Sequence, residues 1–337
     1  MTGKEIKKLF DSFNSMNIMI IGDVMIDAYL WGHVDRVSPE APIPIVSVAK
    51  KEYRLGGAAN VALNIQALGA RPVLCSITGN NEKSGLFMEL MRDNDLDPSG
   101  IIISGDRKTT VKTRIISSNQ QLLRVDEENP EKVSKNAETR FAGLIGSILS
   151  EQRIDAVIFE DYDKGVITPG LINEIRKITS ERGIPVAADP KKRNFAYYRD
   201  IDLYTPNLKE LADGLRTEIS KNDLEGIRQG ANKLQEKNNI KYLMVTLSEK
   251  GIYLSYNDKG KLVPAVIRGV ADVSGAGDTV ISVATACLAA GSSAESMTVL
   301  ANIAGGQVCE KVGVVPVDKK QLLEEIVEYY KTKALTS

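Results

Sequence analysis

The stretch Asp272-Val-Ser-Gly-Ala-Gly-Asp278 runs directly into a predicted helix over Thr279 to Ala290. The first turn of a helix exposes backbone N–H groups without partners and carries partial positive charge. Because residues 275–277 are small, an anion could approach these N–H groups closely. Asp278, in this turn, could accept a proton from an attacking hydroxyl. The same residues also suit a tight turn before a buried helix, with Asp278 stabilised by the helix dipole.

Outward from this stretch, helices alternate with short apolar strands. Predicted helices cover Ala137–Ser150, Thr168–Arg182, Leu208–Gly214, Asp223–Lys237, Met297–Val312 and Asp318–Lys333. Predicted strands cover Ala156–Glu160, Pro185–Asp189, Leu203–Thr205 and Tyr242–Thr246, followed by an antiparallel hairpin of Gly251–Tyr256 and Lys261–Val266. With right-handed crossovers, this alternation predicts an α/β fold with a mainly parallel sheet covered on both faces.

The first third of the chain mixes this rhythm with two β-rich insertions. The regular elements are a strand at Asn17–Gly22, a helix at Ala58–Leu68 closed by Gly69, a strand at Pro72–Ile77 and a helix at Glu82–Asn94. The insertions lie near 28–55 and 101–126 and carry alternating apolar residues typical of extended strands, and the first also carries Pro39, Pro42 and Pro44, which suit an edge strand. We expect one domain over 1–337, with the insertions paired in a small sheet that stands away from the core.

Composition narrows the function classes. The chain has 337 residues, 43% of them hydrophobic, and a formal net charge of −1, so no global basic field attracts nucleic acid. Cys75, Cys287 and Cys309 are far apart without a CxxC pair, which argues against disulfides and a thiolate zinc site. His33 is the only histidine, which disfavours a Ser/His/Asp hydrolase. With no secretory signal and no apolar run near the ~20 residues of a membrane span, we expect a cytoplasmic protein.

Three further motifs carry polar groups, each with a structural alternative. Gly56-Gly57-Ala-Ala-Asn60 permits close backbone approach to a ligand and offers an amide for hydroxyls, or serves helix-to-sheet packing. Asn207-Leu-Lys-Glu210 suits a magnesium–phosphate site through bound waters, or a capping box. Asp189-Pro-Lys191-Lys192-Arg193 follows a buried strand, where three cations suit a phosphate or form a solvated turn. Asp161 and Lys164 follow the preceding strand, and they too suit either a phosphate site or a solvated turn.

A fourth group is basic and lies on the second insertion. It contains Lys108, Lys112, Arg114 and Arg124, of which residues 112 and 114 share one face of a strand. These cations suit a substrate phosphate, or protect an edge strand from aggregation. We favour the protective role for Lys108 and substrate binding for Arg114.

Together the motifs resemble the ribokinase-like (PfkB) family of carbohydrate kinases. The glycine pair at 56–57 matches that family's amino-terminal signature, and Asp272 to Thr279, DVSGAGDT, matches its carboxy-terminal signature. The resemblance covers about 17 to 330 and implies a three-layer α/β/α fold with a small β lid. A P-loop sequence, GxxxxGK[ST], does not occur here, and no GxGxxG follows the first strand, which argues against a dinucleotide-binding dehydrogenase.

Longer stretches resemble the kinase part of bifunctional ADP-heptose synthesis proteins. These are GDVMIDAYLWGHVDRVSPEAPIPIV, LGGAANVALNIQALGA, TTVKTRIISSNQQLLRVD and ADPKKRNFAYY. The resemblance implies ATP-dependent phosphorylation of C1 of D-glycero-D-manno-heptose 7-phosphate, and we expect no nucleotidyltransferase domain in this chain. The alternatives are a related kinase for fructose 6-phosphate, ribose or a nucleoside, and a sugar-phosphate sensor without catalysis.

The resemblance also implies roles for single residues. Asp278 would be the base, and the amides of Gly275, Ala276 and Gly277 would form the anion hole. ATP and Mg²⁺ would be bound by Asn207, Glu210, Thr246, Ser248, Gly251, Ser274 and Asn302, with the metal held by Asn207 and Glu210 through water. The sugar phosphate would be bound by Asp27, Gly56, Gly57, Asn60, Arg114, Asp189 and Lys191. The insertions would form a lid over the sugar and a homodimer interface, with neither nucleic acid nor membrane as a partner.

Overall fold

The computed structural model describes residues 1–117, 120–257, 259–266 and 268–336. The central sheet has nine strands: β1 (Asn17–Gly22), β4 (Arg71–Gly79), β5 (Ile101–Ser104), β8 (Ala156–Glu160), β9 (Val186–Asp189), β10 (Leu203–Tyr204), β11 (Tyr242–Thr246), β12 (Ile252–Tyr256) and β13 (Lys259–Val263). Their order is β13-β12-β11-β10-β9-β8-β1-β4-β5. Only the pairings of β12 are antiparallel, so the predicted mainly parallel sheet with an antiparallel hairpin at its edge is confirmed.

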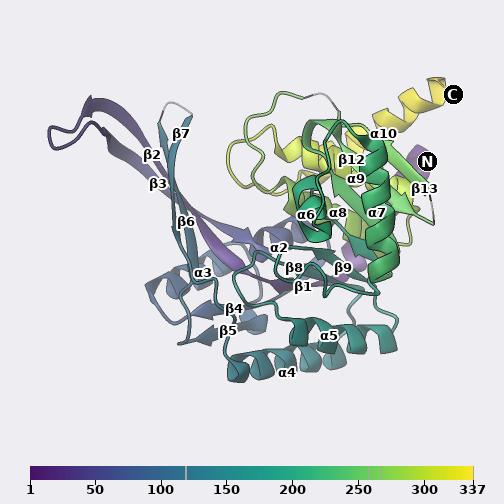
Figure 1. Ribbon diagram of the computed structural model, residues 1–337, viewed down its shortest axis with the longest axis horizontal. Coiled ribbons are helices and arrows are strands. Elements are labelled where there is room, and N and C mark those ends of the chain that lie inside the picture. Colours follow the sequence, from purple (N-terminus) through teal and green to yellow (C-terminus); the bar gives the residue numbers. More distant parts are fainter. Residues whose placement is uncertain (118–119, 258, 267, 337) are drawn as a thin grey trace.

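Helices cover both faces of this sheet. One face packs on α4 (Lys135–Glu151), α5 (Pro169–Glu181), α6 (Leu208–Leu215) and α7 (Leu224–Asn238), of which α4 and α5 run side by side in Figure 1. The other packs on α1 (Gly3–Ser12), α2 (Ala58–Ala67), α3 (Glu82–Asp93), α8 (Ala276–Ala289), α9 (Ala294–Val308) and α10 (Lys319–Thr336). Within β1, Ile18 and Ile20 join the second core, whereas Met19 and Ile21 join the first. This alternation of apolar residues on both faces requires two helical layers.

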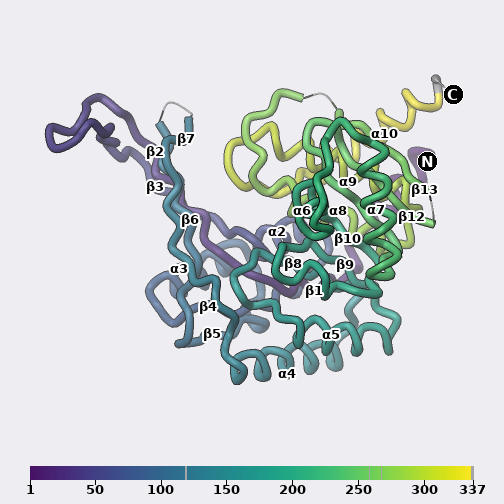
Figure 2. The backbone as a smooth tube through the Cα atoms, in the orientation of Figure 1, coloured from purple at the N-terminus to yellow at the C-terminus, as the bar shows by residue number. Residues whose placement is uncertain are grey.

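A second, four-stranded sheet forms an arm beside the body (Figures 1 and 2). Its order is β3-β2-β6-β7, with β2 (Val24–Val37), β3 (Pro44–Gly57), β6 (Thr110–Ser117) and β7 (Gln120–Glu127). We call this sheet the lid. The predicted pairing of the two insertions is confirmed, because β2 and β6 run parallel.

The second insertion nevertheless begins later than we predicted. Ile101–Ser104 form β5, which extends the central sheet by pairing with β4. Ile102 packs into the core there, so an apolar strand that looked like part of the lid belongs to the body. The lid part of the second insertion starts at Thr110.

Two glycines shape the junction of lid and body. Gly57 precedes α2 with φ +60° and ψ −135°, which only glycine adopts readily. A Cβ at Gly57 would lie 2.4 Å from the carbonyl oxygen of Asp23, and one at Gly56 would lie 2.0 Å from Oδ2 of Asp27. The pair therefore lets the lid strand β3 pass close to these two aspartates.

Two further findings concern the cysteines and the possibility of a membrane span. Cys75, Cys287 and Cys309 are free, as expected. Across the part of the chain that the structure describes, none of the helices combines the length and apolarity needed to cross a bilayer.

Candidate active site

The site centres on the amino terminus of α8, which begins at Ala276, three residues earlier than predicted. The earlier start follows from Gly275, whose φ of +80° turns the chain into the helix. Among the described residues, no side chain caps this end. The N–H of Ala276 donates to the carbonyl of Val273 at 3.3 Å, so one of the three predicted amides is already engaged. Those of Gly275 and Gly277 remain the better candidates for an anion.

Asp278 lies in the first turn of α8 and is only 3% exposed. Its Oδ2 accepts a hydrogen bond from Nδ2 of Asn60, and its Oδ1 accepts one from the hydroxyl of Tyr162, both at 2.7 Å. Burial raises the pKa of Asp278, while these two hydrogen bonds lower it and the nearby carboxylate of Asp27 raises it again. The net effect is a raised pKa, which suits a carboxylate that takes up a proton.

Hydrogen bonds between α2 and α8 hold Asn60 and Asp278 in place. Thr279 donates its hydroxyl to Oδ1 of Asn64 at 3.0 Å, and Oδ1 of Asn64 also accepts the N–H of Val317 at 3.0 Å. Nδ2 of Asn64 donates to the carbonyl of Asn60 at 2.9 Å. The side-chain amide of Asn64 thus joins α8, which carries Asp278, to α2, which carries Asn60.

Tyr162 is positioned by a loop that wraps around a buried carboxylate. Asp23 is 1% exposed and accepts the backbone N–H groups of Tyr162, Lys164 and Val166, each at 3.0 Å. Asp161 turns to the other side, where its Oδ2 accepts from Asn194 and Tyr198. Asp161 is therefore structural. Sequence reasoning missed both Asp23 and Tyr162, and the only available signal for Tyr162 was its place just after the carboxyl end of a buried strand.

At the base of the lid, Asp27 forms a buried ion pair with Arg114. The Arg114 guanidinium lies 5.5 Å from the ring centre of Tyr29, and that of Arg54 lies 5.0 Å from it. The Tyr29 hydroxyl accepts the N–H of Val314 at 3.0 Å, which joins the lid to the loop after α9. The predicted sugar-binding residues Asp27, Gly56 and Arg114 therefore come together.

Lys191 is the central cation of a second group of predicted residues. Its Nζ lies 2.7 Å from Oε1 of Glu210 and 3.4 Å from Oδ1 of Asp189. Burial raises the pKa of Asp189 to about 7, with Lys191 opposing the shift and the carboxylates of Glu210 and Asp278 adding to it. The Lys191 ammonium thus lies between the carboxylates of Glu210 and Asp189, and the charge of Asp278 is close enough to raise the pKa of Asp189.

Glu160 adds a further carboxyl group that sequence reasoning did not single out. It is fully buried beside Asp189 in the sheet, and neither oxygen has a hydrogen-bond partner among the described residues. Burial, then the carboxylates of Asp189 and Asp278, raise its pKa well above the usual range. Glu160 therefore favours its neutral form more strongly than an exposed carboxyl group does.

Asn207 and Glu210 form the capping box that was the structural alternative. Oδ1 of Asn207 accepts the N–H of Glu210, and Oε2 of Glu210 accepts the N–H of Asn207, both at 2.9 Å. In the described parts of the chain, no three His, Cys, Asp or Glu side chains gather into a metal cage. The single Glu210 carboxylate beside Asn207 still fits Mg²⁺, which usually keeps several waters.

The predicted nucleotide residues fall into two sets. Asn207, Thr246 and Ser248 line a hollow of about 670 Å³ beside the carboxyl end of β11. Gly251, with φ +95°, ends the turn after Ser248. Ser274 and Asn302 lie elsewhere: the Ser274 N–H donates to Oδ1 of Asp272 at 2.9 Å, and the Asn302 amide donates to the carbonyl of Pro264 at 2.8 Å.

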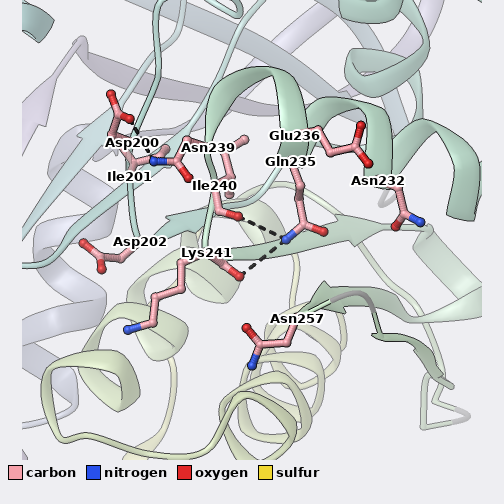
Figure 3. A pocket seen from close by; sticks show the side chains of 10 residues that line it. All are labelled: Asp200, Ile201, Asp202, Asn232, Gln235, Glu236, Asn239, Ile240, Lys241 and Asn257. Atoms are coloured by element: carbon pink, nitrogen blue, oxygen red, sulfur yellow. Dashed lines mark hydrogen bonds between the residues drawn. The ribbon is translucent and has the colours of Figure 1, made fainter.

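A different polar pocket, of about 470 Å³, lies at the opposite ends of the strands (Figure 3). It lies next to the amino ends of β10 and β11, whereas Asp189 marks the carboxyl end of β9. Its polar groups bond to one another: Nε2 of Gln235 donates to the carbonyl of Ile240 at 3.1 Å, and Nδ2 of Asn239 donates to Asp200 at 2.9 Å. This pocket has no connection with the predicted chemistry.

Comparison with known proteins is consistent with this site. The pfkB family carbohydrate kinase model matches residues 15–320. The bifunctional protein HldE of Sulfurimonas denitrificans is 38% identical over 322 residues, which cover 96% of this chain and 65% of that protein. HldE of Koribacter versatilis is 39% identical over 311 residues, covering 92% of this chain and 63% of that protein. The chain thus spans just under two thirds of the length of these relatives.

Solved structures show the same fold. Phosphofructokinase-2 from Escherichia coli, in complex with potassium, superposes with a TM-score of 0.77 at 17% identity, covering 94% of this chain and 99% of that one. Arabidopsis thaliana ribokinase, complexed with ribose and ATP, gives 0.68 at 19% identity, covering 92% and 98%. The predicted ribokinase-like architecture is confirmed. With the family model covering most of its length, the chain belongs to the pfkB family of carbohydrate kinases and is a phosphotransferase.

Proposed function

We propose that this protein transfers the γ-phosphoryl group of ATP to the C1 hydroxyl of D-glycero-D-manno-heptose 7-phosphate, giving the 1,7-bisphosphate. The observation that carries the proposal is the buried Asp278 carboxylate at the uncapped start of α8, oriented by Asn60 and Tyr162. The choice of sugar is supported by the HldE relatives. The product would feed ADP-heptose synthesis for lipopolysaccharide in the cytoplasm.

In this proposal Asp278 accepts the proton of the acceptor hydroxyl as it attacks the γ-phosphorus. A hemiacetal hydroxyl is more acidic than an ordinary alcohol, so a carboxylate is an adequate base. The amides of Gly275 and Gly277 and the ammonium of Lys191 stabilise the charge on the transferred group. Asn207 and Glu210 would hold Mg²⁺ through water, and that ion supplies charge neutralisation on the nucleotide phosphates when bound.

The lid would cover the sugar and exclude water, which otherwise competes as acceptor. It also presents apolar side chains to solvent: Val34, Val37, Ile43, Val48, Leu122, Leu123 and Val125 are all more than one third exposed. Exposed apolar groups on one small sheet are typical of an interaction surface. We therefore propose that two copies of the chain pair through their lids.

Mass analysis of the product from purified protein, ATP, magnesium and heptose 7-phosphate tests the function. We expect a mass gain of one phosphoryl group and release of ADP. Fructose 6-phosphate, ribose and nucleosides serve as competing acceptors in the same assay. Strong turnover of one of these, with none of heptose 7-phosphate, contradicts the choice of sugar. Binding of sugar without any ADP release would instead support the sensor.

A further inference from the structure

Two lysines from separate parts of the chain meet near the base of the lid. Lys112 comes from β6, and Lys164 from the loop that wraps around Asp23. Nζ of Lys164 lies 2.8 Å from Oε2 of Glu128, and Nζ of Lys112 lies 3.8 Å from the same oxygen. The two lysine side chains are only 13% and 14% exposed. The ammonium groups of two largely buried lysines therefore lie near a single carboxylate oxygen.

A third cation, Arg107, contacts the backbone of Lys164. Nη2 of Arg107 donates to the carbonyl of Lys164 at 2.7 Å. Its Nε and Nη1 are buried and have no hydrogen-bond partner within the described residues. Burial lowers the pKa of Arg107, and the carboxylate of Asp23 opposes this shift. Unsatisfied donors on a buried guanidinium are costly and indicate a site that favours a further anion.

The carboxylates nearby do not balance these cations. Asp126 lies 3.3 Å from Nζ of Lys112, but it also accepts two hydrogen bonds from Arg124. Glu128 is the carboxylate that contacts both lysines, and its side chain is 27% exposed, about twice as much as those of the lysines it joins. A dianion with three acceptor oxygens offers these ammonium groups more hydrogen bonds than the single buried Oε2 of Glu128, and could replace it.

Short stretches of chain connect both lysines to residues of the candidate site. Tyr162 reaches Asp278 with its hydroxyl, and Lys164 follows two residues later, a backbone span of at most about 7 Å. The bonds to Asp23 fix both ends of this span. On the lid, Lys112 pairs in register with Asp27 and lies two residues before Arg114. Lys112 therefore shares a lid strand with the predicted sugar-binding Arg114, and Lys164 shares a loop with Tyr162.

We propose that Lys112 and Lys164 bind the terminal phosphate of the acceptor sugar, and that Glu128 occupies this position until the sugar phosphate arrives. The inference rests on the proposed function, because it requires an acceptor with its phosphate at the end opposite the reacting hydroxyl. Arg107 contributes charge from behind Lys164. The site thus selects phosphorylated sugars over their unphosphorylated counterparts.

The test compares kcat/KM for heptose 7-phosphate with that for unphosphorylated heptose, both with C1 as acceptor. Lys112→Met and Lys164→Met each lower this ratio by about 10–100-fold, the scale of a charge-assisted hydrogen bond, and KM for ATP stays the same. Glu128→Gln lowers KM for heptose 7-phosphate, since it removes the competing charge. Lys135→Met, on an α4 side chain that is 83% exposed, is the matched control and leaves the ratio unchanged.

The outcomes separate this inference from the choice of sugar. If the wild-type protein turns over heptose 7-phosphate and both lysine variants keep the ratio, the phosphate site is overturned while the function stands. If the wild-type protein prefers another sugar phosphate and the variants raise KM for that one, the phosphate site stands and the heptose assignment falls. A Glu128→Gln variant with a higher KM also counts against the proposal, whatever the lysine variants do.

Discussion

Two buried aspartates belong to the proposed sugar site, and the protein holds them differently. Asp278 is held by two neutral donors, the amide of Asn60 and the hydroxyl of Tyr162. Asp27 is held by a cation, the guanidinium of Arg114. Both side chains are almost fully buried, at 3% and 2% exposed. Burial therefore does not distinguish them, and the nature of the partner does.

The difference explains the roles that we propose for the two residues. A neutral donor orients a carboxylate without neutralising it, so the charge of Asp278 remains available to attract a proton. A guanidinium both neutralises and fixes its partner, which suits Asp27 to a lasting structural link between lid and sugar. Four sets of substitutions test the roles that we propose for these residues and their neighbours.

The largest expected effect comes from Asp278→Asn. The amide cannot take up the acceptor proton, and we expect turnover to fall by roughly 10²–10⁴-fold with the fold retained. Coupled ADP-release assays measure the rate, and thermal melting checks the fold. Turnover near the wild-type level in a folded variant would show that Asp278 is not the base.

Arg114→Met should cost stability, since it leaves the Asp27 charge buried without a partner. Loss of one member of a buried ion pair typically destabilises by about 3–5 kcal/mol. Urea denaturation measures the change, with Arg124→Met as the control. Arg124 also pairs with a carboxylate but is 50% exposed, so its loss should cost at most about 1 kcal/mol. Equal losses in the two variants would contradict the contrast.

Tyr162→Phe should move the acid limb of the kcat/KM profile. The Tyr162 hydrogen bond lowers the pKa of Asp278, so its removal raises that pKa further. The ionised base is then lost at higher pH, and the limb shifts upward by about 1–2 pH units, with activity restored at alkaline pH. Tyr197→Phe, at a side chain that is 48% exposed, is the control. A uniform loss at all pH values would point to misplacement of the loop instead.

The smallest expected effect is a difference in stability between alanine substitutions at two glycines of the same turn. Gly275→Ala forces alanine to φ +80° with its Cβ 2.9 Å from Nδ2 of Asn60, and we expect a cost of about 1–2 kcal/mol. Gly277→Ala meets only Oδ2 of Asp189, at an ordinary 3.5 Å, and should keep the stability. Thermal melting of both variants decides. Equal stability would mean that the turn tolerates a side chain at either position.

Regular apolar periodicity made most of the fold predictable. The strands Asn17–Gly22, Ala156–Glu160 and Tyr242–Thr246 were predicted with the observed ends, because each is a short buried run next to polar residues. Ile101–Ser104 was misassigned, since an apolar edge strand has the same pattern in either sheet. Which sheet it joins depends on pairing partners, and these are set by the tertiary structure.

The site was predictable only where a motif constrains the backbone. Gly57 and Gly275 were visible because glycine is the residue that most readily adopts the positive φ found at both positions. Tyr162 and Glu160 were not visible, because their importance comes from the carboxylates that the fold brings beside them. The capping box at Asn207 shows the same limit, since the pattern that caps a helix here is also the one that we predicted as a phosphate site.

One residue, Asp23, separates strand β1 of the body from strand β2 of the lid. A single residue leaves almost no slack between the lid and β1, the seventh of the nine strands in the central sheet. The same residue holds the Tyr162, Lys164 and Val166 amides through its carboxylate. A motion of the lid relative to the body would therefore be transmitted to the loop that carries Tyr162. Amide hydrogen exchange at these three positions would record that motion.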